Sequence, residues 1–281
     1  MAAALAEGRP VVALETSIVG QGLPAPHNLK AARACEAAIR EEGATPATVA
    51  VLDGRLRVGL DDAGLERIAA GSVKVSARDL GAVIIQRAAG ATTVAATVRV
   101  AAMAGIRFFA TGGIGGIHRG HPEDQSADLV ELARSPVAVF CAGAKIILDL
   151  RLTLERLESL SVPVLGYGTD EFPAFYSRRS GCPVSARVDG AEECARTLRA
   201  SWDAGGQGAV VAVPPPADLE GAEEMTRRAV AEMHDVSGPD VTPRLLARVA
   251  ELSGGRSLDV NVDLVVNNAR VAAQVVRAYL V

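Results

Sequence analysis

Residues 136–160 read PVAVFCAGAKIILDLRLTLERLESL, and this stretch contains a pattern that recurs along the chain. The apolar run at 136–141 predicts a buried strand. The segment 145–160 predicts a helix, because its apolar residues recur at helical spacing on one face, at Ile147, Leu150, Leu154 and Leu157. A strand that leads directly into a helix is the repeating unit of a sheet of parallel strands.

The same alternation of short β-branched runs and helical segments extends through the rest of the sequence. Further strands are predicted at 11–14, 48–52, 55–60, 107–111, 162–166 and 209–213. Further helices are predicted at 28–42, 62–70, 80–88, 93–104, 127–134, 190–204, 219–234, 242–252 and 262–280, with Thr242-Pro243 as an N-terminal cap. We therefore expect an α/β fold with a mostly parallel central sheet flanked by helices on both faces. Residues 1–281 are expected to form a single domain.

The composition excludes several classes of function. The 281 residues are 49% hydrophobic, and the formal net charge is −4. No block of five basic residues occurs, so we expect no nucleic-acid polymer as a partner. The apolar runs are only as long as strands and no basic leader precedes them, which predicts a cytoplasmic protein without a membrane segment. The four cysteines lack paired spacing and are interpreted as small buried hydrophobes rather than zinc ligands.

Polar residues that follow the predicted strands indicate where the chemistry lies. In parallel sheets, ligands bind beyond the carboxyl ends of the strands. Glu15 follows the strand at 11–14, the glycine loop 112–116 follows 107–111, and Lys145 follows 136–141. These residues are therefore expected to share one edge of the sheet.

Lys145 has two interpretations from its local sequence, CAGAKII. A desolvated lysine at the edge of a sheet can lose its proton and act as an amine nucleophile. Alternatively, a lysine at the start of a buried helix can extend its ammonium group to solvent while its stem packs on apolar neighbours.

Two further motifs also leave alternatives open. The glycine loop is either a phosphate cradle or a tight turn. The segment Asp124-Gln125-Ser126-Ala127-Asp128 spaces three oxygen-bearing side chains two residues apart, which suits a hard cation such as Mg²⁺ or Mn²⁺. In the alternative interpretation, Ser126 or Asp128 caps the helix that follows. Asparagines in the last apolar helix indicate either capping or polar contact with a ligand; they are Asn261, Asn267 and Asn268.

Several long motifs, in the same order along the chain, make the sequence from about residue 10 onward resemble the pseudouridine-5′-phosphate glycosidase family. They include VALETSIVGQGLP, KVSARDL, GATTVAATV, FFATGGIGGIHRG, DQSADLVELA, CAGAK, GYGTDEFPAFY and VVNNA. The resemblance implies reversible cleavage of the bond between C1′ of ribose 5-phosphate and C5 of uracil. It also implies a covalent intermediate in which the ring-opened ribose is attached to a lysine.

The resemblance assigns roles to residues of this chain. It implies that Lys145 is the nucleophile and Glu15 the proton donor and acceptor. It implies that Asp124 binds Mn²⁺, with Mg²⁺ or another divalent ion as a substitute, and that the enzyme is a homotrimer acting in pseudouridine catabolism. Substrate-binding positions implied in the same way are Lys74, Val94, His118, Ser126, Ala127, Asp128 and Asn261.

The chain departs from the family pattern at two places. Ile146 stands where the family usually has serine, and residues 213–217 read VPPPA where relatives tend to carry an amide and a carboxylate. Both changes spare the positions assigned to the chemistry. Two other hypotheses are a Schiff-base aldolase or lyase acting on another sugar phosphate, and a regulatory protein that binds a sugar phosphate without turning it over.

Overall fold

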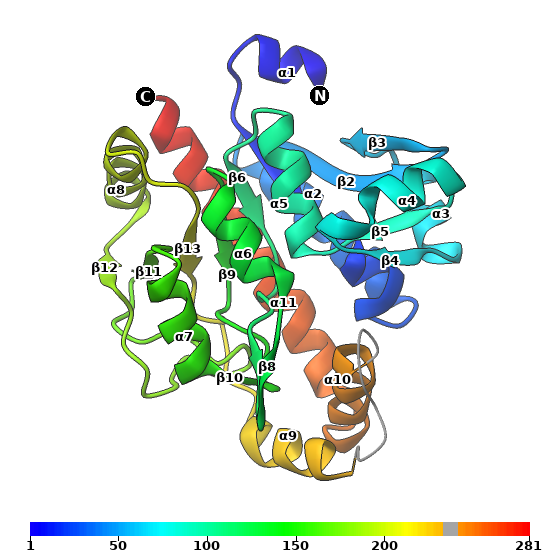
Figure 1. Cartoon of the computed structure of the whole chain (residues 1–281), viewed down its shortest axis with the longest axis vertical. Helices are drawn as coiled ribbons and strands as arrows, with labels where there is room; N and C mark the ends of the chain where they lie inside the picture. Colours follow the sequence, from blue (N-terminus) through cyan, green and yellow to red (C-terminus); the bar gives the residue numbers. More distant parts are fainter. Residues whose placement is uncertain (233–240) are drawn as a thin grey trace.

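A computed structural model describes residues 1–232 and 241–281 (Figure 1). Its main sheet has ten strands, and nine of them follow the order β12-β11-β13-β9-β6-β1-β2-β5-β4, with β3 paired to β2. The bounds are β1 Val11–Leu14, β2 Thr45–Leu52, β3 Arg55–Val58, β4 Val73–Val75, β5 Gly90–Thr92, β6 Phe108–Ala110, β9 Ala138–Cys141, β11 Val164–Tyr167, β12 Ala186–Val188 and β13 Ala209–Ala212. From β12 to β2 every neighbouring pair is parallel.

Helices cover both faces of this sheet, as Figure 1 shows. On one face the long helix α11 packs against α2 and α8 and crosses β6, β1 and β9, while α5, α6 and α7 lie side by side on the other face. The bounds are α1 Ala2–Ala6, α2 His27–Glu41, α3 Asp62–Ala70, α4 Leu80–Gln86, α5 Val94–Met103, α6 Ala127–Arg134, α7 Leu150–Ser159, α8 Ala191–Asp203, α9 Ala222–Ala231, α10 Val241–Leu252 and α11 Arg256–Leu280. The predicted α/β class with a mostly parallel sheet is confirmed.

The sheet changes direction at one end. The strand β2 pairs antiparallel with both β3 and β5, and β5 then pairs parallel with β4. The β2–β3 hairpin turns at Asp53-Gly54, where both residues have positive φ, as a two-residue hairpin turn requires. The three-residue strands β4, β5 and β12 were not predicted, because so few residues show no measurable alternation.

The helix predicted at 145–160 is wrong over its first five residues, since α7 begins only at Leu150. Asp149 caps α7 by accepting a hydrogen bond from the Leu152 amide at 3.0 Å. The preceding residues form β10 (Leu148–Asp149), which joins β7 (Ile117–His118) and β8 (His121–Gln125) in a small antiparallel sheet. Ile147 is buried in the core although it is not helical. Its apolar side chain therefore matched the helical spacing of Leu150, Leu154 and Leu157 without belonging to that helix.

The predicted helix at 219–234 corresponds to α9, and His234 lies outside the described residues. The helix predicted at 242–252 corresponds to α10, but its proposed cap at Thr242-Pro243 involves side chains that also lie outside the description. The four cysteines are buried with free thiols, as expected of small hydrophobes. None of the helices in residues 1–232 and 241–281 has the length and hydropathy needed to cross a bilayer.

Substitutions of two leucines on neighbouring helices can test which face of these helices belongs to the core. Leu132 on α6 is fully buried, whereas Leu152 on α7 is 41% exposed. Leu132→Ala is expected to lower the free energy of unfolding by about 2–5 kcal/mol, because it removes methyl groups from a packed interior. Leu152→Ala, the matched control, should change it by less than about 0.5 kcal/mol. Urea unfolding measures both, and equal losses would contradict this assignment of the core.

Candidate active site

The glycine loop after β6 and the loop after β9 run side by side and are joined by backbone hydrogen bonds. The Ala142 amide donates to the Gly112 carbonyl at 2.9 Å, the Ile114 amide to Gly143 at 3.1 Å, and the Lys145 amide to Ile114 at 3.1 Å. The pairing of β6 with β9 thus continues beyond the strands. It fixes the backbone of Lys145 at the carboxyl edge of the sheet.

The loop that holds Lys145 is also packed from its other side. The Phe175 amide donates to the Ala142 carbonyl at 2.9 Å. Gly143 has a φ of +80°, and a Cβ atom there would lie 1.8 Å from the Pro173 carbonyl oxygen. Only glycine fits this position, because any side chain would collide with backbone that cannot move aside. The small residues of CAGAK are therefore explained by two chain segments packing tightly against that loop.

One pocket at this edge collects four residues predicted from the sequence. Its lining includes Glu15, Lys74, Lys145 and Asn261, together with Thr111. Lys145 and Glu15 are half-buried, whereas Lys74, on β4, is exposed. The sequence contains only three lysines, and the third, Lys30, is exposed on α2. The two lysines other than Lys30 thus line one pocket.

Glu15 supplies the carboxyl group among the described residues that line this pocket. Its carboxylate accepts hydrogen bonds from the hydroxyls of Ser17 and Thr111. Burial raises the pKa of the Glu15 carboxyl above its ordinary value, while Lys145 and the two hydroxyls oppose that rise. A carboxyl group whose pKa is raised in this way, beside a lysine, can act both as a donor and as an acceptor of protons.

A second group of polar residues lies on the small sheet. His118 Nε2 on β7 is 4.0 Å from Asp124 Oδ2 on β8. Burial lowers the pKa of His118, Asp124 raises it, and the positive charges of Lys145 and Lys74 are among the groups that lower it further. These electrostatic effects connect His118 with the lysine pocket. Together the side chains of His118, Lys145 and Lys74 favour an anionic ligand.

Asp128 and Ser126 do not form the three-oxygen cation site that their spacing suggested. Asp128 is 5% exposed, and its carboxylate accepts from the Ala95 amide at 2.8 Å and the Gly115 amide at 2.7 Å. Ser126 caps α6 by accepting from the Asp128 amide at 3.2 Å. The capping alternative is therefore correct for Ser126. Asp128 instead ties the glycine loop to the start of α5, and its contact with a substrate stays a prediction.

The structure explains the glycines of the loop by packing. A Cβ atom at Gly113 would lie 2.7 Å from the Phe175 ring, and one at Gly116 would lie 2.3 Å from the Thr153 hydroxyl. The amides of Ile114 and Gly115 already donate within the protein. These contacts favour the tight-turn interpretation, and binding of phosphate by this loop stays a prediction.

The remaining substrate positions lie on helices around the same edge. Val94, the first residue of α5, is 1% exposed, and Ala127, the first residue of α6, is exposed. Their contacts with a substrate also stay predictions. Asn261 on α11 is 4% exposed, and its amide nitrogen lies 3.5 Å from the Tyr176 hydroxyl. Asn268, two turns further along α11, is fully buried and donates to the Thr111 carbonyl at 2.8 Å.

Several residues of this site were not assigned a role from the sequence. Ser17 and Thr111 hold the Glu15 carboxylate, and the apolar wall of the pocket includes Ile18, Phe175 and Leu246. Phe175 has a φ of +59°, a strained conformation for a bulky residue and one that is frequent at functional sites. The π-helical turn η1 (Ile18–Gly22) that directly follows Ser17 is a second unusual local feature. Neither conformation leaves a readable signal in the residue pattern.

A divalent cation would find one exposed carboxylate at the predicted position. Asp124 is 54% exposed in its side chain, and no three His, Cys, Asp or Glu side chains gather into a metal cage within the described part of the chain. Mn²⁺ and Mg²⁺ commonly keep several water ligands and add one or two carboxylates and a substrate phosphate. Asp124 fits that open kind of site and does not fit an all-protein cage.

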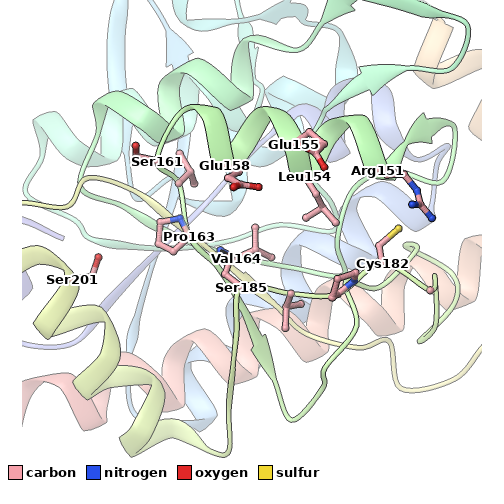
Figure 2. A pocket seen from close by; sticks show the side chains of 14 residues that line it. Arg151, Leu154, Glu155, Glu158, Ser161, Pro163, Val164, Cys182, Ser185 and Ser201 are labelled. Carbon is pink, nitrogen blue, oxygen red and sulfur yellow. Dashed lines mark hydrogen bonds between the residues drawn. The ribbon is translucent and has the colours of Figure 1, made fainter.

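A larger hollow lies elsewhere, between α7 and the segment that leads to β12, and Figure 2 shows it. It encloses about 850 Å³, and Glu155 and Glu158 project from α7 beside Pro163 and Val164 (Figure 2). Val164 is the first residue of β11, so this hollow lies at the amino end of that strand, opposite to where parallel sheets bind ligands. None of the predicted site residues lines it. The smaller lysine pocket is therefore the candidate active site.

Comparison with known proteins gives consistent matches over nearly the whole chain. The profile of the family described as indigoidine synthase A like protein matches residues 1–278. Pseudouridine-5′-phosphate glycosidases from Nocardioides sp. and Deinococcus radiodurans are each 52% identical to the chain; the alignments cover 99% of this chain and 94% and 93% of those proteins.

Two solved structures have the same fold. The prealnumycin C-glycosynthase AlnA, in complex with ribulose 5-phosphate, is 39% identical with a TM-score of 0.90, over 99% of this chain and 94% of that chain. An indigoidine synthase A-like protein from Thermotoga maritima is 32% identical, also with a TM-score of 0.90, over 96% and 93% of the two chains.

The raised pKa of Glu15 predicts a stability effect. A carboxyl that holds its proton more tightly in the folded state contributes stability that is lost as the pH rises from its unfolded toward its folded pKa. At pH 8, Glu15→Gln should therefore raise Tm, because it removes a carboxylate whose ionised form is disfavoured by burial. The gain should be smaller at pH 5. Calorimetry at both pH values measures it, and a gain that grows toward acid pH would contradict the assignment.

Proposed function

The chain belongs to the pseudouridine-5′-phosphate glycosidase family, and we propose that it cleaves pseudouridine 5′-phosphate reversibly to uracil and ribose 5-phosphate. The observation that supports this proposal most directly is the placement of Lys145 and Glu15 in one pocket at the carboxyl edge of the sheet. Relatives about half identical in sequence are named for this activity. A nucleophilic amine beside a proton-exchanging carboxyl is what the reaction needs.

The chemistry of the bond explains why a lysine is needed. Uracil C5 carries no lone pair, so protonation cannot make it a leaving group as it would an oxygen. We propose that the ribose ring opens as Glu15 gives a proton to the ring oxygen, and that Nζ of Lys145 bonds to C1′. When the C1′–C5 bond breaks, the lysine nitrogen forms an iminium with C1′. C5 takes up a proton as the C1′–C5 bond breaks, and the bonding pair restores the C5=C6 double bond of uracil. Water then hydrolyses the iminium and releases ribose 5-phosphate.

The positively charged edge of the pocket is suited to the phosphate. Lys74 lines the pocket, and its charge acts on His118 across the site. We propose that these two side chains bind the 5′-phosphate, and that Ser126 and Asn261 contact the rest of the substrate. Asp124 would hold a divalent cation, Mn²⁺ in the first instance, whose chemistry is to neutralise phosphate charge. The proposed enzyme is a cytoplasmic homotrimer that acts in pseudouridine catabolism, and sedimentation of the purified chain measures its oligomeric state.

Lys145 can be tested by activity and by trapping. Lys145→Ala is expected to reduce uracil release, with Mn²⁺ present, by on the order of 10³-fold or more, because the covalent route is lost. Borohydride reduction in the presence of ribose 5-phosphate should add the mass of the reduced sugar phosphate to Lys145 and not to Lys30. Because the chain has only three lysines, peptide mapping assigns the adduct directly.

Different outcomes distinguish the hypotheses. A trapped adduct without uracil release would favour a Schiff-base aldolase or lyase that acts on another sugar phosphate. Binding of ribose 5-phosphate with neither release nor adduct would favour a regulatory protein. Omitting Mn²⁺ in the wild type and in Asp124→Asn separates the contribution of the cation from that of the lysine.

If Lys74 binds the 5′-phosphate, the effect of replacing it should depend on whether the substrate carries that phosphate. Lys74→Ala should lower kcat/KM for pseudouridine 5′-phosphate by about 10–100-fold, the value of a charge-assisted hydrogen bond. With pseudouridine itself, which lacks the phosphate, wild type and variant should be equally slow. Lys30→Ala on exposed α2 is the matched control. An equal loss with both substrates would show that Lys74 does not bind the phosphate.

A further inference from the structure

The Glu15 carboxylate is held by two hydroxyls that come from different parts of the chain. The Ser17 hydroxyl donates to Oε2, and the Thr111 hydroxyl donates to Oε1. Each carboxylate oxygen can accept two hydrogen bonds, so each keeps one acceptor position after these contacts. The pair therefore restricts the orientation of Glu15 without blocking its access to the pocket.

Thr111 is itself rigidly placed. Its amide donates to the Phe140 carbonyl at 3.0 Å, and its carbonyl accepts from the Asn268 side chain at 2.8 Å. The residue is 1% exposed. Ser17, by contrast, is half-buried and lies two residues beyond Glu15, just before the π-helical turn η1. One hydroxyl is thus anchored in the sheet and the other in the segment that carries Glu15.

Burial, neighbouring charges and the two hydroxyls act on the ionisation of Glu15 in different directions. The charged groups that act on it are Lys145 in the loop after β9, which favours ionisation, and Asp128 on α6, which opposes it. Lys74 on β4 lines the same pocket. Burial favours the neutral acid. A hydroxyl that donates to the carboxylate stabilises the ionised form, so Ser17 and Thr111 both act against burial.

We propose that Ser17 and Thr111 are positioning residues that favour the ionised form of Glu15 and aim its remaining lone pairs at the bound ribose. The catalytic part of this inference rests on the proposed function. An ionised Glu15 can take up the proton that Lys145 loses, which leaves the lysine as a neutral amine. The same proton can then pass from the carboxyl group to the ring oxygen of the ribose as the ring opens. No other reactant is needed for this exchange.

The ionisation of Glu15 is measured directly by NMR titration of protein labelled with ¹³C at the glutamate carboxyls, and the resonance lost in Glu15→Gln identifies Glu15. Ser17→Ala and Thr111→Val are each expected to raise the titration midpoint of Glu15 by about one pH unit, because each removes a hydrogen bond to the ionised form. Ser17→Thr, which keeps a hydroxyl, should restore it. Ser159→Ala, at an exposed serine of α7 whose hydroxyl donates to the Glu155 carbonyl, should leave it unchanged.

Kinetics supply a second readout for the same variants. In Ser17→Ala, kcat should fall by about 10–100-fold while KM changes by less than about threefold, since the hydroxyl orients Glu15 without contacting substrate. The limb of the pH profile that is altered in Glu15→Gln should move to higher pH. A purely structural role would instead lower the rate equally at every pH.

The two proposals fail in different ways. If the Glu15 midpoint stays fixed in both Ser17→Ala and Thr111→Val, or moves as much in Ser159→Ala, the positioning inference is wrong. Should Ser17→Ala not fold, Ser17→Cys keeps a similar volume with only a weak donor and is expected to show the same upward shift. The titration needs no turnover. Absence of uracil release from the wild type would therefore contradict the proposed function while the NMR result still decides the role of the hydroxyls.

Discussion

The backbone pairing between the glycine loop and the loop that carries Lys145 is the constraint on which the rest of the site depends. Three amide-to-carbonyl hydrogen bonds join residues 112–114 to residues 142–145 and extend the β6–β9 ladder past the ends of the strands. Backbone hydrogen bonds of this kind require the two chains to approach closely. That requirement explains why the loops are rich in glycine and alanine, and why Gly143 meets the Pro173 carbonyl with no space for a side chain.

This rigid frame allows the pocket to hold a buried acid that would otherwise be unfavourable. A carboxylate removed from water loses hydration, and only fixed partners can compensate. Glu15 obtains them from Ser17, from Thr111 and from the charge of Lys145. Because β6, β9 and α11 hold Thr111 in place, the compensation does not depend on flexible surface groups. The pocket therefore keeps a carboxyl group and a lysine, whose charges attract each other, close together in one place.

Residues close together in the sequence have separate tasks in the structure. Within DQSAD, Asp124 faces outward on β8 and Ser126 caps α6, while Asp128 turns inward and connects the glycine loop to α5. The same division holds on α11, where Asn261 lines the pocket and Asn268, two turns away, supports the backbone of Thr111. Both motifs therefore combine a residue with an exposed or pocket-lining side chain and a buried residue that supports the backbone of a neighbouring loop.

The class of the fold could be predicted from the sequence alone, because short apolar runs such as 136–141 and amphipathic helices such as 28–42 reflect local periodicity and the face that is buried. The sequence also indicated which polar residues gather at one edge of the sheet, because the rule for parallel strands needs only the strand ends, and this rule placed Glu15 and Lys145 there.

The local sequence pattern could not predict where α7 begins, because Ile147 is buried by neighbours far away in the chain. Nor could it separate the roles of Asp124 and Asp128, or assign roles to Ser17, Thr111 and Phe175. Those were decided by tertiary structure, since a hydrogen bond between residues 15 and 111 joins segments that only the folded sheet brings into contact.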